Sequence, residues 1–265
     1  MSEDFSFVID GPLATLTFTR PAKANAFHPR MAASMRRCFL EVHHNADVRC
    51  VLIKGEGKHF MAGGDLEAIV DFDKISDVER SDAGEGVIHE YNVMVRTMQR
   101  LDVPVVASVQ GGVAGAAVGF VGACDLVIAA DTAFFWIAHV LHGGSIDGLT
   151  TFFTPRHIGL RNAMKLALLA DRISGTEAAE LGLISFVVPE ANLAVETSKL
   201  VSRLCAGPTK GYGKIKKLLY ASFGNSMMEQ GRMEAESYGE ILHTEDVKHG
   251  LKAFFAREQP QFKGR

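Results

Sequence analysis

The sequence predicts an α/β protein with a spiral or doubly wound core and a helical C-terminal region. The runs 48–57 and 104–110 are continuous and β-rich, as expected for strands covered on both faces. Each leads through a small-residue loop into a helix, so residues 50–70 and 105–125 are two versions of one unit. Two helix N-termini would then face one cavity. From about residue 190 the chain has helical periodicity and no strand signal.

The elements before this cavity follow in order along the chain. Residues 5–21 predict a β-hairpin, because two alternating β runs flank an Asp-Gly-Pro turn. Residues 29–48 place apolar side chains at helical spacing and end in an Asn-Ala-Asp turn. The charged stretch 71–86 is expected to be a mobile loop, and 87–101 predicts a helix.

The second half of the chain predicts a third strand and the helical tail. The strand covers residues 125–136 and is followed by a loop at 139–150, while 199–223 and 247–262 predict helices. We expect a core over residues 1–195 and an oligomerisation region over 196–265.

Composition excludes several classes of protein. With 265 residues and 47% apolar content, the chain can bury a full core in one domain. A net charge of −3 gives no electrostatic reason to bind nucleic acid or an anionic membrane. Four lysines within 210–217 favour a solvated helix face over a nucleic-acid site. The acidic start lacks the apolar segment of a secretory signal, and four cysteines without CxxC spacing indicate reduced thiols in the cytoplasm.

One uncharged run is long enough to cross a bilayer. It covers residues 105–124 and includes five glycines but no leucine or isoleucine. This composition favours a buried strand followed by a buried helix, and we expect no membrane span.

The glycine-rich loops do not fit phosphate-binding motifs. No GxxxxGK[ST] string is present, and Gly112, Gly115 and Gly119 give GxxGxxxG in place of GxGxxG. Small residues at a helix start also let backbone N–H groups approach a bound atom. Two such loops can form an oxyanion hole, in which one donor contributes roughly 2.7–4 kcal/mol. The alternative is that the small residues only permit tight helix–sheet packing.

The chain resembles the crotonase (enoyl-CoA hydratase/isomerase) superfamily over nearly its whole length. The resemblance rests on "RPAKANAF", "GKHFMAGGDL", "VQGGVAGAAVGFVGACDLVIAADTAFF" and "AFFAREQPQF". The region of Asp147 and the tail look most like phenylacetate-pathway enoyl-CoA isomerases. This resemblance implies a spiral of ββα units, a C-terminal helical trimerisation region and acyl-CoA substrates. It also implies that Gly64 and Ala116 supply the two oxyanion N–H groups.

The resemblance also limits which reaction of the superfamily is expected. A hydratase of this superfamily needs two carboxylates, which should stand where this chain has Gly119 and His139. Neither residue is a carboxylate, so hydration by the two-glutamate mechanism is not expected.

Asp147 is the remaining candidate for proton transfer. Its position matches the catalytic aspartate of the isomerases and the nucleophilic aspartate of aroyl-CoA dehalogenases. The segment 134–142 would give it apolar walls and raise its pKa. The alternative is that Asp147–Gly148 only forms a turn.

His139 and His142 could pair with Asp147 or simply line the pocket. A zinc site is not expected, because two histidines and one aspartate in a loop are not a zinc motif. A His/Asp pair could also support hydrolysis of β-diketone carbon–carbon bonds. A non-catalytic acyl-CoA binder is the alternative outside enzymes, motivated by the loss of both hydratase carboxylates.

The predicted function is a 3-enoyl-CoA to 2-enoyl-CoA isomerase with Asp147 as the proton shuttle. No cofactor is expected beyond the CoA of the substrate, and the expected assembly is a homotrimer or a dimer of trimers. The segment 71–86 and residues near Phe135 and Trp136 would shape the acyl pocket. The expected CoA-binding residues are Lys23, Ala24, Ala26, Ala62, Gly63, Gly64, Asp65, Leu66, Ala116 and Trp136.

Overall fold

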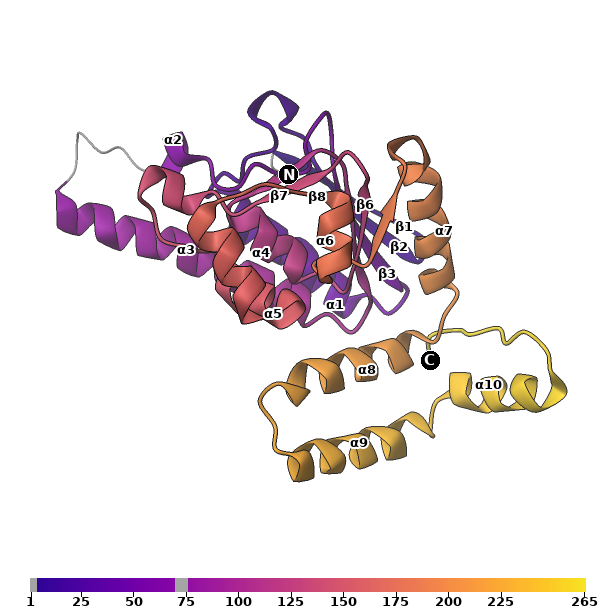
Figure 1. Ribbon diagram of the computed structural model, residues 1–265. Helices are drawn as coiled ribbons and strands as arrows, with labels where there is room; N and C mark the ends of the chain where they lie inside the picture. The colour runs from indigo at the N-terminus through magenta and orange to yellow at the C-terminus, as the bar shows by residue number, and fades with distance from the viewer. Residues whose placement is uncertain (1–3, 70–75) are drawn as a thin grey trace.

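The computed structural model describes residues 4–69 and 76–265 (Figure 1). A six-stranded sheet in the order β1-β2-β3-β4-β6-β9 forms its centre, with parallel pairing except between β1 and β2. Its strands are β1 (Phe5–Asp10), β2 (Leu13–Phe18), β3 (Cys50–Gly55), β4 (Val105–Val109), β6 (Leu126–Ala130) and β9 (Phe186–Val188). The hairpin expected over residues 5–21 is therefore confirmed.

A second, three-stranded sheet makes the core a spiral. It contains β5 (Gly112–Ala114), β7 (Phe134–Trp136) and β8 (Ile173–Ser174), in the order β5-β7-β8. The chain steps from β4 to β5 and again from β6 to β7, so the repeated unit is strand, strand, helix. The single strand predicted over 125–136 was wrong. A turn closed by the Ala133 N–H on the Ala130 carbonyl separates two strands that belong to different sheets.

Helices surround the two sheets (Figure 1). The α-helices of the core are α1 (Met31–His44), α2 (Leu66–Ile69), α3 (Asp77–Gln99), α4 (Ala116–Gly122), α5 (Thr150–Leu169), α6 (Gly175–Leu181) and α7 (Leu193–Cys205). The described residues also form the short 3-10 helices η1 (Pro21–Lys23), η2 (His139–His142) and η3 (Glu190–Asn192). The tail contains α8 (Thr209–Ser222), α9 (Met227–Ile241) and α10 (Glu245–Ala256).

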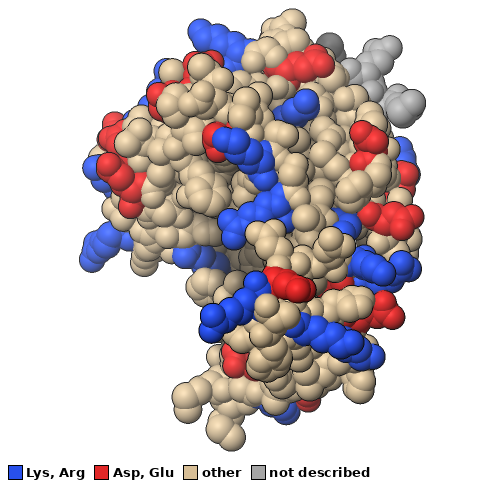
Figure 2. Space-filling view, turned by 90° about the vertical axis from the view of Figure 1, so that its right-hand side faces the viewer, with Lys and Arg blue, Asp and Glu red and all other residues tan. Residues whose placement is uncertain are grey.

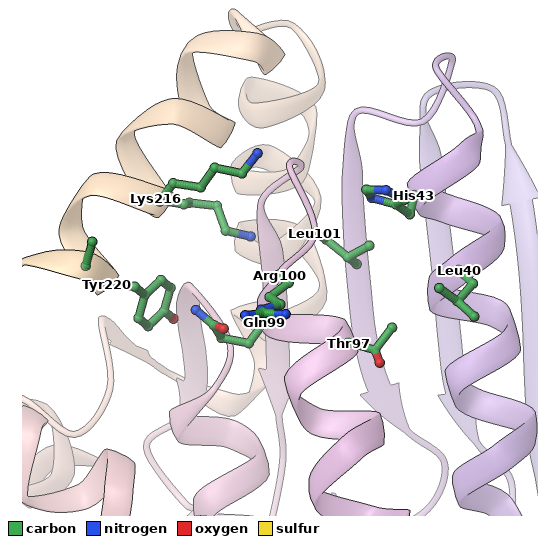
Figure 3. A pocket seen from close by; sticks show the side chains of 10 residues that line it. Leu40, His43, Thr97, Gln99, Arg100, Leu101, Lys216 and Tyr220 are labelled. Carbon is green, nitrogen blue, oxygen red and sulfur yellow. The ribbon is translucent and has the colours of Figure 1, made fainter. Parts of the chain in front are cut away.

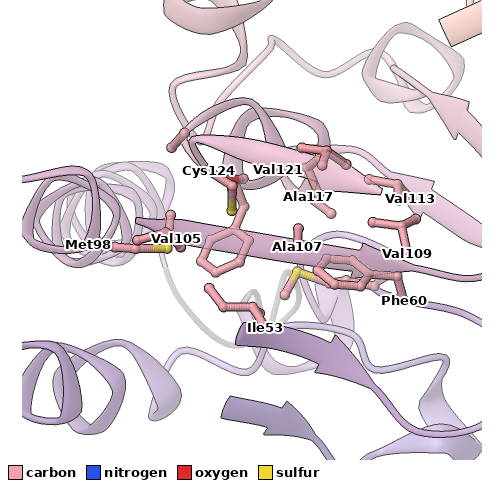
Figure 4. Close-up of a cluster of buried hydrophobic side chains, with 14 of the residues drawn as sticks. Ile53, Phe60, Met98, Val105, Ala107, Val109, Val113, Ala117, Val121 and Cys124 are labelled. Atoms are coloured by element: carbon pink, nitrogen blue, oxygen red, sulfur yellow. The ribbon is translucent and has the colours of Figure 1, made fainter. Parts of the chain in front are cut away.

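The segment 105–124 lies in the centre of the core (Figure 4). Its strand β4 is buried along its whole length, and so is helix α4. Phe120 packs edge-on against Phe18, whose ring also contacts Phe60. The prediction of a buried strand followed by a buried helix is confirmed. Within the described residues, no helix combines the length and apolar character needed to cross a membrane.

Helix α3 begins ten residues earlier than predicted. Residues 77–86 were expected to be a mobile loop, but they form its first turns; residues 71–75 lie outside the described part of the chain. Ser76 caps the helix, because its hydroxyl accepts from the Glu79 N–H while the Glu79 carboxylate accepts from the Ser76 N–H. This capping box offsets the weak helix propensity of Gly84 and Gly86.

Helix α7 lies on the central sheet, whereas α8 lies beside the core and α9 and α10 lie further from it (Figure 1). The division of the chain at residue 195 stays a prediction. Figure 2 shows basic and acidic side chains interspersed on the face that lies to the right in Figure 1.

One lysine of α8 differs from the expected solvated face, on which Lys210 and Lys217 are exposed. Lys216 is 9% exposed, and its Nζ donates to the Val103 carbonyl and pairs with Asp125 at 2.6 Å. Lys217 pairs with Asp102 at 2.7 Å. These contacts hold α8 on the core beside a cavity of about 650 Å³ between α8, α1 and the end of α3 (Figure 3).

Candidate active site

The two predicted glycine-containing loops lie against each other. Residues Met61 and Val113 form a parallel β-bridge, which brings the segments after them together. A Cβ built on Gly63 would lie 2.8 Å from the Ala114 carbonyl oxygen, and one on Gly115 would lie 3.6 Å from the Gly63 Cα. Gly63 also has φ +91°, which disfavours a side chain. Close approach of the two backbones therefore requires glycine at position 63, whereas at position 115 the positive φ of +57° favours it.

Two backbone N–H groups in these loops are available to a bound atom. Gly64 follows the close contact and forms a β-bridge with Phe27, whereas Ala116 begins helix α4. Neither the Gly64 N–H nor the Ala116 N–H donates to any acceptor in the described residues. Ala116 is 8% exposed, so its N–H lies in a largely dehydrated environment. This arrangement suits an oxyanion hole.

Tyr91 of α3 fixes one of these loops from behind. Its ring is 3% exposed, and its hydroxyl donates to the Ala116 carbonyl at 3.1 Å. Burial raises the pKa of Tyr91 well above its usual value, and the nearby Asp147 carboxylate raises it further. The phenol therefore stays protonated and holds the first turn of α4 beside Asp147.

Asp147 begins a tight turn that packs on the Ala116 loop. The Thr150 N–H donates to the Asp147 carbonyl at 3.1 Å, and both residues between them have positive φ, +63° at Gly148 and +60° at Leu149. A Cβ on Gly148 would lie 2.6 Å from the Ala116 Cβ. The predicted turn is therefore present. Leu149 adopts a strained left-handed backbone conformation in it, which places Asp147 next to the Ala116 loop.

His139 contacts the Asp147 carboxylate. Its Nε2 lies 3.1 Å from the Asp147 Oδ1, and the two side chains are 7% and 34% exposed. The apolar enclosure expected around Asp147 is therefore incomplete. The Nδ1 of His139 is buried without a hydrogen-bond partner in the described chain. His142 is exposed, with its ring centre 6.3 Å from that of His139, and has no contact with Asp147 of its own.

Gly119 has no room for a side chain. A Cβ there would lie 2.2 Å from the Gly148 carbonyl oxygen and 2.6 Å from the Thr150 nitrogen. Both atoms belong to backbone, which cannot move aside cheaply. The turn after Asp147 therefore occupies the space into which a side chain at position 119 would extend.

The residues expected to bind CoA also come together. The Ala62 N–H donates to the Ala24 carbonyl at 3.0 Å, which places the Lys23–Ala26 segment beside the Ala62–Leu66 loop. Arg20 joins the two segments, because it donates to the Ala26 carbonyl at 2.6 Å and pairs with Asp65 at 2.7 Å.

The charges at this edge differ in their burial. The Arg20 guanidinium beside Asp65 lowers the pKa of that carboxyl, which stays ionised. Lys23 is exposed and pairs with Glu67 at 2.8 Å, and that hydrogen bond raises its pKa. Leu66 is 56% exposed beside them. An exposed cation and an apolar side chain on one edge can receive a phosphate-bearing ligand.

The indole ring of Trp136 is held by Ala170 and Arg172. Its indole N–H donates to the Ala170 carbonyl at 2.8 Å, and the Arg172 guanidinium lies 4.1 Å from its ring centre. Its backbone carbonyl accepts from the Gly115 N–H at 2.9 Å. The structure therefore gives Trp136 a backbone contact at the Ala116 loop. Its place in the acyl pocket stays a prediction, as does that of Phe135, which is 2% exposed.

An apolar pocket of about 160 Å³ adjoins the Asp147 turn, between that turn and α5. The hydroxyls of Thr150 and Thr154 are buried there without a hydrogen-bond partner among the described residues. Its lining includes Ile137, Ile146, Thr150, Thr154, Met164 and Ala167.

Sequence reasoning missed Tyr91 and Arg20. Tyr91 shares a buried helical face with Met94, Val95 and Met98, so its spacing indicated only core packing. Arg20 is the first residue of the RPAKANAF motif, but no sequence pattern showed that it pairs with Asp65. Within the described chain, no cluster of three or more His, Cys, Asp or Glu side chains is arranged to hold a metal ion.

The chain and its fold match known proteins. A model of the enoyl-CoA hydratase/isomerase family matches residues 9–265. The chain is 34% identical to 1,2-epoxyphenylacetyl-CoA isomerase of Escherichia coli K12 over 97% of each chain. An enoyl-CoA hydratase from Polaromonas sp. JS666 superimposes with a TM-score of 0.90 at 26% identity, over 98% of this chain and 99% of that one. A Thermobifida fusca YX protein solved in complex with CoA has a TM-score of 0.82 at 30% identity, over 90% and 93% of the two chains.

Proposed function

The chain belongs to the enoyl-CoA hydratase/isomerase family, and we propose that it moves the double bond of a 3-enoyl-CoA thioester to the 2-position. The observation that supports this reaction best is the packing at Gly119. A hydratase would carry a glutamate there, but the turn after Asp147 fills that space. The turn places a single carboxylate beside the Ala116 loop. One carboxylate suits a proton shuttle better than the addition of water.

In this mechanism the Gly64 and Ala116 N–H groups bind the thioester oxygen. Negative charge grows on that oxygen when the C2 proton leaves, so the two donors stabilise the dienolate more than the substrate. The Asp147 carboxylate accepts the C2 proton and returns it to C4. This yields the 2-enoyl thioester with the double bond conjugated to the carbonyl.

His139 would hold Asp147 in place during both proton transfers. Because an ionised carboxylate only accepts hydrogen bonds, the 3.1 Å contact assigns a proton to the His139 Nε2. A neutral ring then has an unprotonated Nδ1, in agreement with the absence of an acceptor for it in the described residues. His139 would thus act as a donor to Asp147 and not as the base.

The CoA moiety would lie along Lys23, Ala24 and Ala26, with its adenine near the Ala62–Leu66 loop. Lys23 would bind a phosphate of CoA in place of Glu67, because their ion pair is exposed and therefore weak. The known complex of a relative with CoA supports this class of ligand.

The pocket beside Asp147 would receive the acyl group. Its volume of about 160 Å³ is close to that of apolar cavities, of order 150 Å³, that bind benzene. The similarity to 1,2-epoxyphenylacetyl-CoA isomerase supports a substrate with a cyclic or similarly compact acyl group.

The contact between His139 and Asp147 favours one second candidate, the hydrolysis of a carbon–carbon bond in a β-diketone thioester. There the pair would activate water, and the same oxyanion donors would stabilise the enolate that leaves. A binder without catalysis would keep the CoA-binding edge and dispense with Asp147.

The tail suggests that the protein works as an oligomer. Four of its apolar side chains are more than three-quarters exposed: Met227, Met228, Phe254 and Phe255. We propose that they are buried between subunits in a trimer or a dimer of trimers. The cytoplasmic location expected from the spacing of the cysteines stays a prediction.

A substrate screen tests the proposed reaction. Purified protein is offered straight-chain and aromatic 3-enoyl-CoA and 2-enoyl-CoA thioesters, while isomerisation and water addition are both followed. We expect isomerisation of a 3-enoyl thioester far above hydration. Efficient hydration without isomerisation would refute the proposal, and tight binding without any turnover would favour the binder.

A further inference from the structure

The end of α7, the start of α8 and the C-terminus meet at one residue of the core, Arg49. Its guanidinium donates to the Thr209 Oγ1 at 3.0 Å and to the Gly207 carbonyl at 2.5 Å. Gly264 lies so close that a Cβ there would be 3.3 Å from the Arg49 Nε. Arg49 therefore anchors the junction between the α/β core and the helical tail.

Two cysteines from distant parts of the sequence meet at this junction. Cys50 is the first residue of β3 and is fully buried, whereas Cys205 is the last residue of α7 and is half-buried. The Cys50 N–H donates to the Pro12 carbonyl at 3.2 Å, and the Cys205 thiol contacts the same oxygen at 3.7 Å. Both thiols are free, and the contacts with the Pro12 carbonyl place the two cysteines side by side.

We propose that Cys50 and Cys205 are a redox-sensitive dithiol that closes to a disulfide under hydrogen peroxide and joins the end of α7 to the start of β3. This inference does not rest on the proposed reaction, because neither cysteine lies at the active site. The disulfide would also restrain the helical tail, because α8 begins four residues after Cys205.

The two thiols are unequal, which assigns their roles. The hydrogen bond from Cys50 lowers the pKa of Cys205, and the nearby Arg49 charge lowers it further against the opposing effect of burial. The same hydrogen bond and burial raise the pKa of Cys50. Cys205 is therefore the thiol that ionises first, and its partial exposure lets peroxide reach it.

The reaction balances with peroxide as the oxidant. The Cys205 thiolate attacks one peroxide oxygen, the O–O bond breaks, and Cys205 becomes a sulfenic acid while water leaves. The Cys50 sulfur then attacks the Cys205 sulfur, loses its proton and releases a second water. Two thiols have given two electrons to one peroxide, and a dithiol reductant reverses the change.

The test uses the full-length chain treated with hydrogen peroxide. We expect the number of free thiols to fall from four to two, with a peptide linking Cys50 and Cys205 in non-reducing mass spectrometry. Dithiothreitol should restore all four. The oxidised protein should melt roughly 5–10 °C higher than the reduced one, because the disulfide closes a long loop.

Matched variants identify the pair. Cys38→Ser removes a half-buried thiol and Cys124→Ser a buried one, and both variants should still form the link. Cys205→Ser should abolish it. Cys50→Ser should leave Cys205 as a sulfenic acid that dimedone traps. If this buried substitution prevents folding, the peptide maps of the wild type and of Cys205→Ser still show whether Cys50 and Cys205 form the link.

Several results would overturn the proposal. Oxidation of Cys205 without a Cys50 link in the wild type would show that the thiols cannot join. A link that involves Cys38 or Cys124, or one that persists in Cys205→Ser, would assign the reactivity to other residues.

Discussion

The Nε2 of His139 lies 3.1 Å from the Oδ1 of Asp147, on a turn that packs directly against the Ala116 loop. Two interpretations of Asp147 that seemed exclusive in the sequence are thus compatible. The Asp-Gly pair does form a turn, and that turn places the carboxylate beside both a histidine and a candidate oxyanion donor.

The contact with His139 should matter through its hydrogen bond. His139→Phe keeps a ring in the buried site but removes the donor, and should lower kcat about 10–100-fold, since a hydrogen bond to a charged group contributes about 1.5–3 kcal/mol. His139→Gln can still donate and should retain most of the activity. Steady-state kinetics would check this, with the exposed His142→Phe as the control; equal rates for His139→Phe and the wild type would remove His139 from the mechanism.

Gly119 should not tolerate even alanine. Its Cβ would press on the Gly148 carbonyl, so Gly119→Ala should cost about 1–3 kcal/mol and lower the melting temperature by several degrees. Turnover should fall as well, because the Asp147 turn must shift. Gly84→Ala is the control, since open space surrounds that helical glycine and the change should be neutral or stabilising. A fully stable and active Gly119→Ala protein would contradict the packing argument.

The Arg20–Asp65 pair should make stability depend on pH in the acid range. Because Arg20 lowers the pKa of Asp65 in the folded chain, the pair stabilises the protein fully above the ordinary aspartate pKa of 3.8. That contribution is lost as the pH falls through the lower pKa of the folded state. The melting temperatures of the wild type and Asp65→Asn should therefore differ at pH 7 and converge below about pH 3.8. A constant difference across this range would show that Asp65 acts without its charge.

The exposed apolar residues of the tail should mediate assembly. Light scattering at micromolar concentration should give a trimer or a hexamer, and Phe255→Asp should shift the protein toward smaller species. Val8→Asp places a charge on an exposed position of β1 and should leave the mass unchanged. A stable wild-type monomer would contradict the proposed assembly.

The sequence was informative where local chemistry determines structure. The β-rich runs of β3 and β4 predicted buried strands, and the small residues after them predicted two loops with helix starts that face one cavity. The strands are confirmed, and the two loops lie against each other, with space for only a glycine at position 63. The resemblance then added the spiral arrangement, which local patterns left open.

The errors came from contacts between distant segments. Lys216 belonged to a run of lysines typical of a solvated face, but Asp125 and the Val103 carbonyl lie within its reach in the fold. The first turns of α3 have little apolar periodicity and depend on the Ser76 cap. Tyr91 looked like a core residue, and only the tertiary structure places its hydroxyl on Ala116.

The role of Asp147 as the proton shuttle is tested most directly by the turnover of Asp147→Asn at saturating 3-enoyl-CoA, together with a direct measurement of thioester binding. Asparagine forms the same turn but cannot carry a proton, so turnover should fall by about 10²–10⁴-fold, the usual contribution of general acid–base catalysis. Thioester affinity should change little, because Gly64, Ala116 and the CoA-binding edge are intact. A turnover ratio near one, with an active wild type, would contradict the assignment of Asp147 as the proton shuttle.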